Sequence, residues 1–174
     1  MAALRILELF RPRRVAARLA DLDPVALSAE GIRGLVVDVD NTLVPYGSAA
    51  PTEEARRWVA AARDAGLRLV LVTNNRTRRT RAVADGLGLP VASGLMKPST
   101  SGLRRALAMM RTAPEETALV GDQLLTDILA GNRLGLFTIL VQPMGRHEFP
   151  TTRLINRTIE RVLVRLLHLP TPPA

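Results

Sequence analysis

The sequence predicts an α/β fold in which helices cover both faces of a central parallel sheet. Short apolar runs that suit buried strands alternate along the chain with amphipathic segments of roughly ten residues, which is the pattern of parallel α/β proteins. The chain has 174 residues, of which 47% are hydrophobic. This length and composition indicate a single globular domain that buries roughly two-thirds of its unfolded surface.

Five apolar runs are expected to be strands because they are short and rich in Val, Leu and Ile. They cover residues 34–39, 67–72, a short stretch around 91, 118–120 and 136–141. Pro51 to Glu54 opens the first long helix with acidic residues in its first turn, and Gly66 ends it. Asn75 is expected to cap the second helix. The later helices are expected over about 76–86, 98–110, 124–134 and 152–167.

The chain divides into a lead-in, one domain and a tail. Residues 1–30 form a basic amphipathic lead-in, in which leucines lie among arginines. Within it, Asp23 and Pro24 are a helix-start signal for a short turn. Residues 31–169 form the single domain, and the proline-rich residues 170–174 are expected to be flexible.

Composition limits the partners and the compartment. The net charge of +8 comes almost wholly from arginine, and Lys97 is the only lysine among 24 basic residues. An anionic partner fits this charge, but one Trp, one Tyr and three Phe offer few stacking surfaces for nucleic acid. There is no cysteine. No apolar run reaches the 18 or so residues of a membrane span, and no secretory signal is evident. We therefore expect a cytoplasmic protein, with peripheral membrane contact compatible with its charge.

Two carboxylates end the first predicted strand. Asp38 and Asp40 are two residues apart, so their side chains point the same way, about 7 Å apart along an extended strand. Carboxylates held this close repel each other unless a cation or a proton lies between them. Holding the two carboxylates together therefore lowers the stability of the fold, but it places two reactive groups side by side for catalysis.

The next strand ends carry polar groups as well. Thr73, Asn74 and Asn75 follow the second strand, and Lys97 follows the third. Asp122 follows the fourth, with Asp127 five residues later. In open parallel sheets, ligands bind beyond the carboxyl ends of the strands. These side chains are therefore expected to meet at one edge of the sheet.

This set of groups suits phosphoryl transfer to water. One carboxylate can act as nucleophile and a second as general acid and base. Mg²⁺ binds through one or two carboxylates and substrate phosphate, and Asp38 and Asp122 could supply them. Thr73, the amides after it and Lys97 would hold the phosphoryl oxygens. A solitary lysine among arginines also indicates a place that needs a compact ammonium.

The same residues resemble the four signatures of the haloacid dehalogenase superfamily of phosphohydrolases. Residues 38–42 (Asp-Val-Asp-Asn-Thr) resemble the first motif and 73–74 (Thr-Asn) the second. Residues 97–98 (Lys-Pro) resemble the third and 121–127 (Gly-Asp-Gln-Leu-Leu-Thr-Asp) the fourth. All four occur in order and on predicted strand ends, and the resemblance covers residues 30–165 or so.

The resemblance implies roles for the acidic residues. Asp38 would be the nucleophile that forms an aspartyl-phosphate. Asp40 would be the general acid and base, and would lend its backbone carbonyl to Mg²⁺. Asp122 would complete the metal site, and Asp127 would support it indirectly or bind the metal through water. An aspartate at the position of Asp40 is the feature that separates phosphatases from dehalogenases.

For the phosphate, the resemblance implies Thr73, Asn74 and Lys97 as the binding residues, with Lys97 counted among the catalytic groups. The role of Thr42 stays open, because Asn41 and Thr42 could form an Asx-type turn or could orient the catalytic aspartates.

Superfamily members often carry a cap domain after the first strand or between the second and third motifs. Here residues 43–51 are a short loop, and 76–96 are used by one helix and one strand. We therefore expect a capless, Rossmann-like three-layer sandwich. Its open site would admit a bulky substrate, a headgroup at a membrane or a partner chain that acts as a lid.

A narrower resemblance concerns the substrate. Likeness to the YqeG branch of subfamily IIIA rests on stretches 121–135 and 141–143 and on Thr152, Arg153, Asn156, Arg157 and Glu160. This branch is similar to the mitochondrial phosphatases that convert phosphatidylglycerophosphate to phosphatidylglycerol. The resemblance therefore implies a lipid phosphate as substrate, at the inner face of a membrane.

Two other functions fit the residues. One is the same chemistry on a soluble phosphate ester, such as a nucleotide or a sugar phosphate. The other is a basic module that binds RNA or protein and keeps a vestigial site, although unused clustered carboxylates would lower its stability.

The basic elements leave alternatives as well. The last helix carries arginines on one side and apolar residues on the other, so it could lie on an anionic bilayer or pack on the sheet. The lead-in has the same ambiguity. The roles of Arg153, Asn156 and Arg157 and the oligomeric state are not determined by the sequence.

Overall fold

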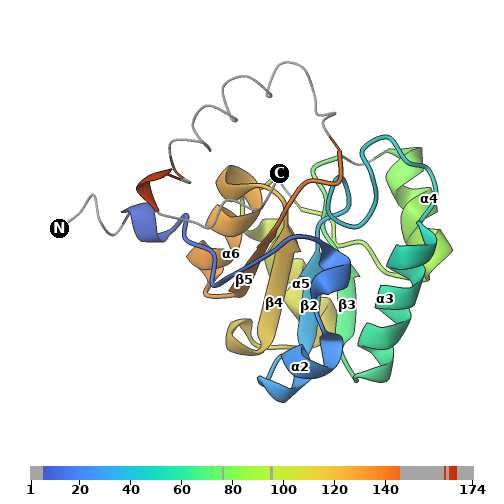
Figure 1. Cartoon of the computed structure of the whole chain (residues 1–174), viewed down its shortest axis with the longest axis horizontal. Coiled ribbons are helices and arrows are strands. Elements are labelled where there is room, and N and C mark those ends of the chain that lie inside the picture. The colour runs from blue at the N-terminus through green and yellow to red at the C-terminus, as the bar shows by residue number, and fades with distance from the viewer. Residues whose placement is uncertain (1–5, 76, 95, 146–162, 164, 168–174) are drawn as a thin grey trace.

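The fold is a five-stranded parallel sheet with helices on both faces (Figure 1). It is seen in a computed structural model that describes residues 6–75, 77–94, 96–145, 163 and 165–167. The strands are β1 (Arg14–Ala16), β2 (Gly34–Val37), β3 (Arg68–Leu71), β4 (Thr117–Gly121) and β5 (Phe137–Val141). Their order in the sheet is β1-β5-β4-β2-β3. The predicted α/β class with a parallel sheet is confirmed.

The central strands end level with one another. Val37 at the end of β2 lies opposite Leu71 of β3 and Val120 of β4. The backbone N–H of Asp38 continues this ladder with a bond to the Val120 carbonyl (2.9 Å). The residues that follow these three strands therefore emerge at the same edge of the sheet.

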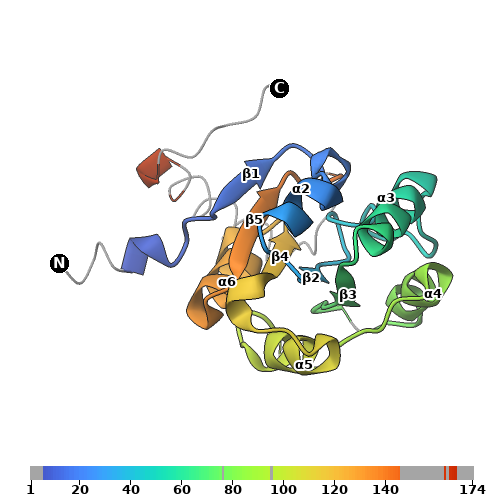
Figure 2. The ribbon, with the colours of Figure 1, turned by 90° about the horizontal axis from the view of Figure 1, so that it is seen from below.

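The helices form a layer on each face (Figure 2). One layer contains α2 (Pro24–Ala29), α3 (Glu53–Asp64) and α4 (Arg78–Leu87), and the other contains α5 (Ser101–Met110) and α6 (Leu129–Leu134). Short 3₁₀ turns occur at Leu19–Asp21 (η1) and Pro114–Glu116 (η2).

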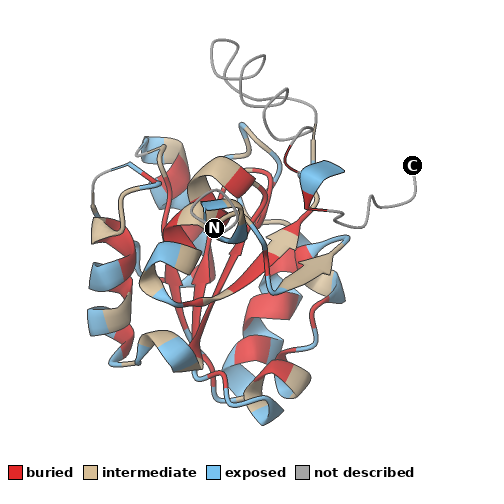
Figure 3. Cartoon of the chain, turned by 90° about the vertical axis from the view of Figure 1, so that its left-hand side faces the viewer, coloured by how far each residue is buried: buried red, intermediate tan, exposed pale blue. Residues whose placement is uncertain are grey.

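Strand side chains alternate between the two layers. Leu35 and Val37 pack with α2, α3 and α4, whereas Val36 packs with α5 and α6. Buried residues accordingly fill the strands and the inner sides of the helices (Figure 3). The predicted three-layer arrangement follows from this alternation, because both faces of the sheet are apolar.

Two strand predictions need correction. Arg14–Ala16 forms β1, which the sequence does not predict, and it pairs with β5 at the edge of the sheet. Three half-buried residues are too few to show a strand period. The short strand expected around Val91 is present as a single bridge to Leu71.

The expected cap of α4 is wrong. The helix begins at Arg78, and the Thr77 hydroxyl accepts the bond from the Thr80 N–H (3.4 Å). Asn75 belongs to the preceding turn, where its backbone N–H donates to the Thr73 hydroxyl (2.9 Å). The helix therefore begins two residues later than the sequence predicts.

Two later helices also differ from the prediction. α5 begins at Ser101 and not at Pro98. The helix expected over 124–134 is divided into a π-helical turn, η3 (Leu124–Ile128), and α6. Wide turns of this kind occur often at functional sites.

Most of the helix expected over 152–167 lies outside the described residues, including Arg153, Asn156 and Arg157. Of its described part, Leu163 is buried and packs with Leu124 and Ile128. Leu166 is exposed.

The described chain contains no cap-sized insertion at either expected place. A loop of 38–52 joins β2 to α3, and α4 with the bridge at Val91 fills the stretch between β3 and Lys97. The capless prediction therefore agrees with the described ranges. Among those ranges, no helix is both long and apolar enough to cross a membrane.

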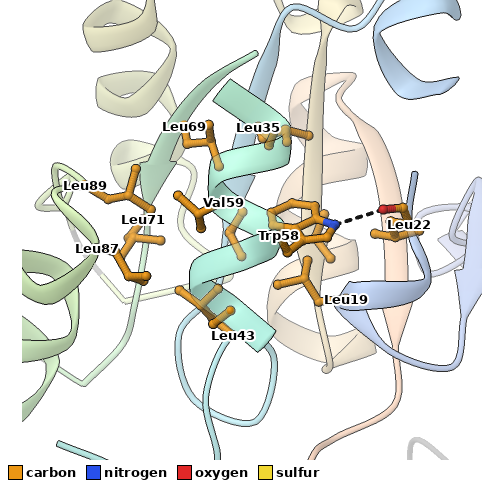
Figure 4. Packing of buried hydrophobic residues seen from close by; sticks show 14 of the residues in the cluster. Leu19, Leu22, Leu35, Leu43, Trp58, Val59, Leu69, Leu71, Leu87 and Leu89 are labelled. Carbon is orange, nitrogen blue, oxygen red and sulfur yellow. Dashed lines mark hydrogen bonds between the residues drawn. The ribbon is translucent and has the colours of Figure 1, made fainter. Parts of the chain in front are cut away.

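A buried tryptophan joins α3 to the segment that precedes α2. Trp58 of α3 is buried against Leu19 and Leu22, and its indole N–H donates to the Leu22 carbonyl (2.9 Å; Figure 4). This bond ties α3 to the segment that leads from η1 into α2. A buried donor and a buried acceptor satisfy each other there.

Trp58→Phe is expected to lower the free energy of unfolding by about 1–3 kcal/mol, because the Leu22 carbonyl loses its partner and the smaller ring leaves space. Urea unfolding measures this change. Val25→Ala on α2 is the control, since the Val25 side chain is exposed. Equal stability of the Trp58 variant and the wild type would contradict the role given to this bond.

Candidate active site

Three buried carboxylates meet at the carboxyl edge of the sheet. Asp38 follows β2, Asp122 follows β4, and Asp127 belongs to η3. Each offers an oxygen within 4.8 Å of the others, and all three residues are buried. The strand ends therefore bring together the groups that the sequence predicts.

Lys97 lies at the centre of this cluster. Its ammonium donates to Asp38 Oδ1 and to Asp127 Oδ1, the latter over 2.6 Å. Its side chain is only 3% exposed. A third contact reaches the Val72 carbonyl at 3.5 Å. The solitary lysine thus supplies a compact cation to two carboxylates at once, in the position expected from the sequence.

The π-helical turn and a glycine place Asp127. Its backbone N–H bonds the Gln123 carbonyl (3.0 Å), and its Oδ2 accepts from the Gln123 N–H (3.1 Å). A Cβ on Gly121 would lie 2.4 Å from the Asp127 carboxyl carbon. Any side chain at residue 121 would therefore displace Asp127, which is 1% exposed and not on the helix surface.

The charges of the cluster perturb its pKa values. Burial raises the pKa of Asp38 to about 7, against the pull of Lys97 and with added repulsion from Asp127 and Asp40. Burial and repulsion from Asp38 raise the pKa of Asp122 well above its usual range. Burial alone would lower the pKa of Lys97, but Asp127 and Asp38 raise it. If all three carboxyls were ionised, their negative charge would exceed that of the one ammonium, which is why protons are held more tightly here.

A divalent metal fits this excess charge. Oδ2 of Asp122 is buried and has no hydrogen-bond partner in the part of the chain that the structure describes. Its Oδ1 accepts a bond from the buried Thr42 hydroxyl (3.4 Å). Thr42 therefore contacts the acidic cluster, and its role in orienting the catalytic aspartates stays a prediction. An orphaned carboxylate oxygen beside Asp38 is the donor that a hard cation requires.

Asp40 lies at the rim of the cluster, with its side chain 16% exposed. Its Oδ2 accepts from the Asn75 side-chain amide (3.4 Å). A guanidinium nitrogen of Arg79 lies 2.6 Å from its Oδ1. Asp40 is thus placed where it can reach both the buried groups and solvent.

Thr73 and Asn74 shape the loop after β3. The Thr73 hydroxyl accepts from the Asn75 N–H, which closes a tight turn (2.9 Å). The Asn74 side chain binds the backbone of Lys97 at two points, accepting from its N–H (2.7 Å) and donating to its carbonyl (3.3 Å). Asn74 therefore holds the Lys97 segment against the second motif, and its predicted contact with phosphate stays a prediction.

A cavity adjoins this loop. Its volume is about 340 Å³, and it runs from Thr73 along α4 to the segment 89–93. The lining combines Thr77 and Arg81 with apolar residues such as Leu89. A substrate group larger than phosphate therefore has space beside the candidate site.

Arg79 is the main residue that the sequence does not single out. It lies in the first turn of α4, its side chain is 17% exposed, and it contacts Asp40 directly. Arginine supplies nearly every basic position of this chain. No local pattern distinguishes Arg79 from its neighbours Arg78 and Arg81, so only the fold reveals its contact.

Comparison with known families agrees with this geometry. Residues 13–135 match the family of haloacid dehalogenase-like hydrolases. The chain belongs to this family. Its fold and its acidic strand-end cluster therefore define a hydrolase of the haloacid dehalogenase type.

Among curated relatives, the chain is 33% identical over 158 residues to "Probable phosphatase YqeG" of Bacillus subtilis, covering 91% of each chain. It is 30% identical over 162 residues to the chloroplastic phosphatidylglycerophosphate phosphatase 1 of Chlamydomonas reinhardtii. That match covers 88% of this chain and 60% of the relative. The resemblance to a phosphatase branch of the superfamily is confirmed.

Solved structures confirm the fold. The cobalt-bound deoxy-D-mannose-octulosonate 8-phosphate phosphatase of Haemophilus influenzae aligns with a TM-score of 0.53 at 12% identity. The alignment covers 80% of this chain and 91% of that one. At this identity the likeness concerns the fold alone.

Asn74→Ala is expected to lower kcat/KM for a phosphate ester by about tenfold to a hundredfold, because the Lys97 segment loses both of its anchors and the ammonium shifts. Steady-state kinetics measures the loss. Met96→Ala is the matched control, since Met96 precedes Lys97 and is exposed. Full activity of the Asn74 variant would show that the two bonds do not position Lys97.

The contribution of Asp38 to the stability of the metal-free protein is expected to fall as pH rises from about 4 to about 7. The folded state holds the proton of Asp38 up to a pKa of about 7, whereas the unfolded chain releases it near 3.8. Over this window the folded state binds more protons, so raising pH favours unfolding.

Asp38→Asn removes this titration. Urea unfolding in the presence of a chelator should therefore show the variant gaining stability relative to the wild type as pH rises through the window. Parallel stability curves for the two proteins would contradict a raised pKa at Asp38.

Proposed function

We propose that this protein is a Mg²⁺-dependent phosphomonoester hydrolase that works through an aspartyl-phosphate on Asp38. The observation that carries the proposal is the buried Asp38–Lys97–Asp127 contact beside the unpartnered oxygen of Asp122. It lies at the edge of a parallel sheet, where ligands of such folds bind. Membership of a hydrolase family supports the reaction class.

In the first step, a carboxylate oxygen of Asp38 attacks the phosphorus, and the bond from phosphorus to the ester oxygen breaks. Lys97 binds one oxygen of Asp38, which orients the carboxylate and offsets part of the charge. Asp40 gives a proton to the departing oxygen, so the alcohol leaves neutral. The product of this step is a phosphate joined to Asp38.

In the second step, water attacks the same phosphorus and the bond to Asp38 breaks. Asp40, now ionised, takes the proton from the water, and inorganic phosphate leaves. Thr73, Asn74 and Lys97 are the proposed groups that hold the phosphoryl oxygens. Asp40 suits this part because it lies between the buried cluster and solvent.

Asp38, Asp122 and the backbone carbonyl of Asp40 are the proposed metal-binding groups. The oxygen-only donor set and the orphaned Asp122 Oδ2 fit Mg²⁺. When bound, the ion would offset part of the negative charge of the phosphate and the two carboxylates. Asp127 binds Lys97 and Gln123, so its proposed part is to support the site without direct coordination.

Phosphatidylglycerophosphate is the proposed substrate, at the cytosolic face of a membrane. One relative that matches over 88% of this chain is named a phosphatidylglycerophosphate phosphatase. The absence of a cap-sized insertion in residues 38–52 and 72–94 leaves the site open to a headgroup. A net charge of +8 suits an anionic membrane.

Asp38→Asn is expected to reduce phosphate release by at least about a thousandfold, because the amide cannot accept the phosphoryl group. Wild-type release should require Mg²⁺ and stop with a chelator. Asp64→Asn, at the exposed end of α3, is the control. Normal turnover by Asp38→Asn would exclude Asp38 as the nucleophile.

A substrate panel tests the lipid assignment. Phosphatidylglycerophosphate in mixed micelles should be hydrolysed with a higher kcat/KM than glycerol 3-phosphate, a nucleoside monophosphate or a sugar phosphate. Fast turnover of one soluble ester with indifference to lipid would favour a soluble substrate. Salt-sensitive RNA binding without any metal-dependent phosphate release would favour the vestigial binding module.

A further inference from the structure

Arg79 is held by three residues of the loop after β2. One guanidinium nitrogen lies 2.6 Å from Asp40 Oδ1, and another donates to the Ser48 carbonyl (3.0 Å). The guanidinium carbon lies 5.7 Å from the centre of the Tyr46 ring. The loop after β2 and the first turn of α4 therefore meet at this side chain.

Its place on the helix is unfavourable by itself. α4 has no acidic residue in its first turn, and the first turn of a helix carries partial positive charge. A cation there gains nothing from the helix. The Asp40 carboxylate and the Tyr46 ring supply the compensation, so the geometry ties Arg79 to the rim of the site.

The contact with Asp40 is Coulombic more than directional. The guanidinium nitrogen of Arg79 and Oδ1 of Asp40 lie at ion-pair distance, but their angles do not meet hydrogen-bond geometry. Both atoms are buried. Asp40 Oδ2 is held separately by the Asn75 amide (3.4 Å). The ion pair at Oδ1 and the Asn75 bond at Oδ2 together hold the Asp40 carboxylate from two sides.

We propose that Arg79 is a positioning residue that orients Asp40 for proton transfer to the departing oxygen. This inference rests on the proposed function, in which Asp40 is the general acid. Arg79 does not touch the phosphoryl group in this proposal. It acts through Asp40, and Tyr46 and Ser48 keep its guanidinium in place.

The proposal predicts a dependence on the leaving group. An alkoxide is a strong base and needs a proton as it departs, whereas p-nitrophenolate is stabilised by its ring and leaves as an anion. A misdirected Asp40 should therefore slow alkyl esters far more than p-nitrophenyl phosphate. A defect in folding would slow both substrates equally.

The test compares kcat/KM for p-nitrophenyl phosphate and for glycerol 3-phosphate, with Mg²⁺ and the full chain. Arg79→Met should lower the value on the order of a hundredfold for the alkyl ester and less than about threefold for the aryl ester. Arg79→Lys should recover only part of the loss, because it keeps the charge but lacks the two nitrogens that contact Asp40 and Ser48 at the same time. Arg78→Met is the matched control on the same turn of α4, since Arg78 is exposed.

A double-mutant cycle gives a second readout. In an Asp40→Asn background, Arg79→Met should cause no further loss with the alkyl ester, because the residue through which it acts is already gone. Losses that multiply in the double variant would overturn the inference. So would equal losses for both substrates in an active series of variants, which would leave the proposed function intact. A wild type without phosphatase activity would overturn both.

Discussion

The site depends on one ammonium ion that is surrounded by carboxylates and closed off from water. Lys97 binds Asp38 and Asp127, while Asp122 shares the same buried space. A single cation cannot balance three acidic groups if all of them ionise, and unbalanced buried charge is costly, so either protons or a metal ion must offset it. The strands, the π-helical turn and the Asn74 anchors hold this arrangement in place, and a bound cation would relieve its remaining charge.

Much of this arrangement is predictable because parallel strands end at a common edge. Asp38, Asp122 and Lys97 each follow a strand-like run, so the rule for open sheets assigns them to one place before any contact is known. The resemblance assigns Asp127 to the site as a supporting residue. Its burial depends on the wide turn of η3 and on the missing side chain of Gly121, and neither has a periodic signal.

Other features are not predictable for identifiable reasons. The three residues of β1 are too few for a period, and they become a strand only because β5 offers an edge. Arg79 is one arginine among many, and its contact with Asp40 exists only once α4 packs beside the loop after β2. Local sequence patterns therefore predict the site residues that directly follow a strand. They do not predict residues that reach the site only through the packing of distant elements.

The pairing of β1 with β5 has a consequence for biosynthesis. Among the described residues, β1 is the first strand along the chain and β5 the last, yet they are neighbours in the sheet. On the ribosome, the segment that becomes β1 emerges early and has no partner until β5 is made. The central strands β2, β3 and β4 are all made before β5, so the strands that carry the candidate site are available to pair first. A nascent chain therefore has an unpaired segment to shield during synthesis, which is a situation that chaperones commonly meet.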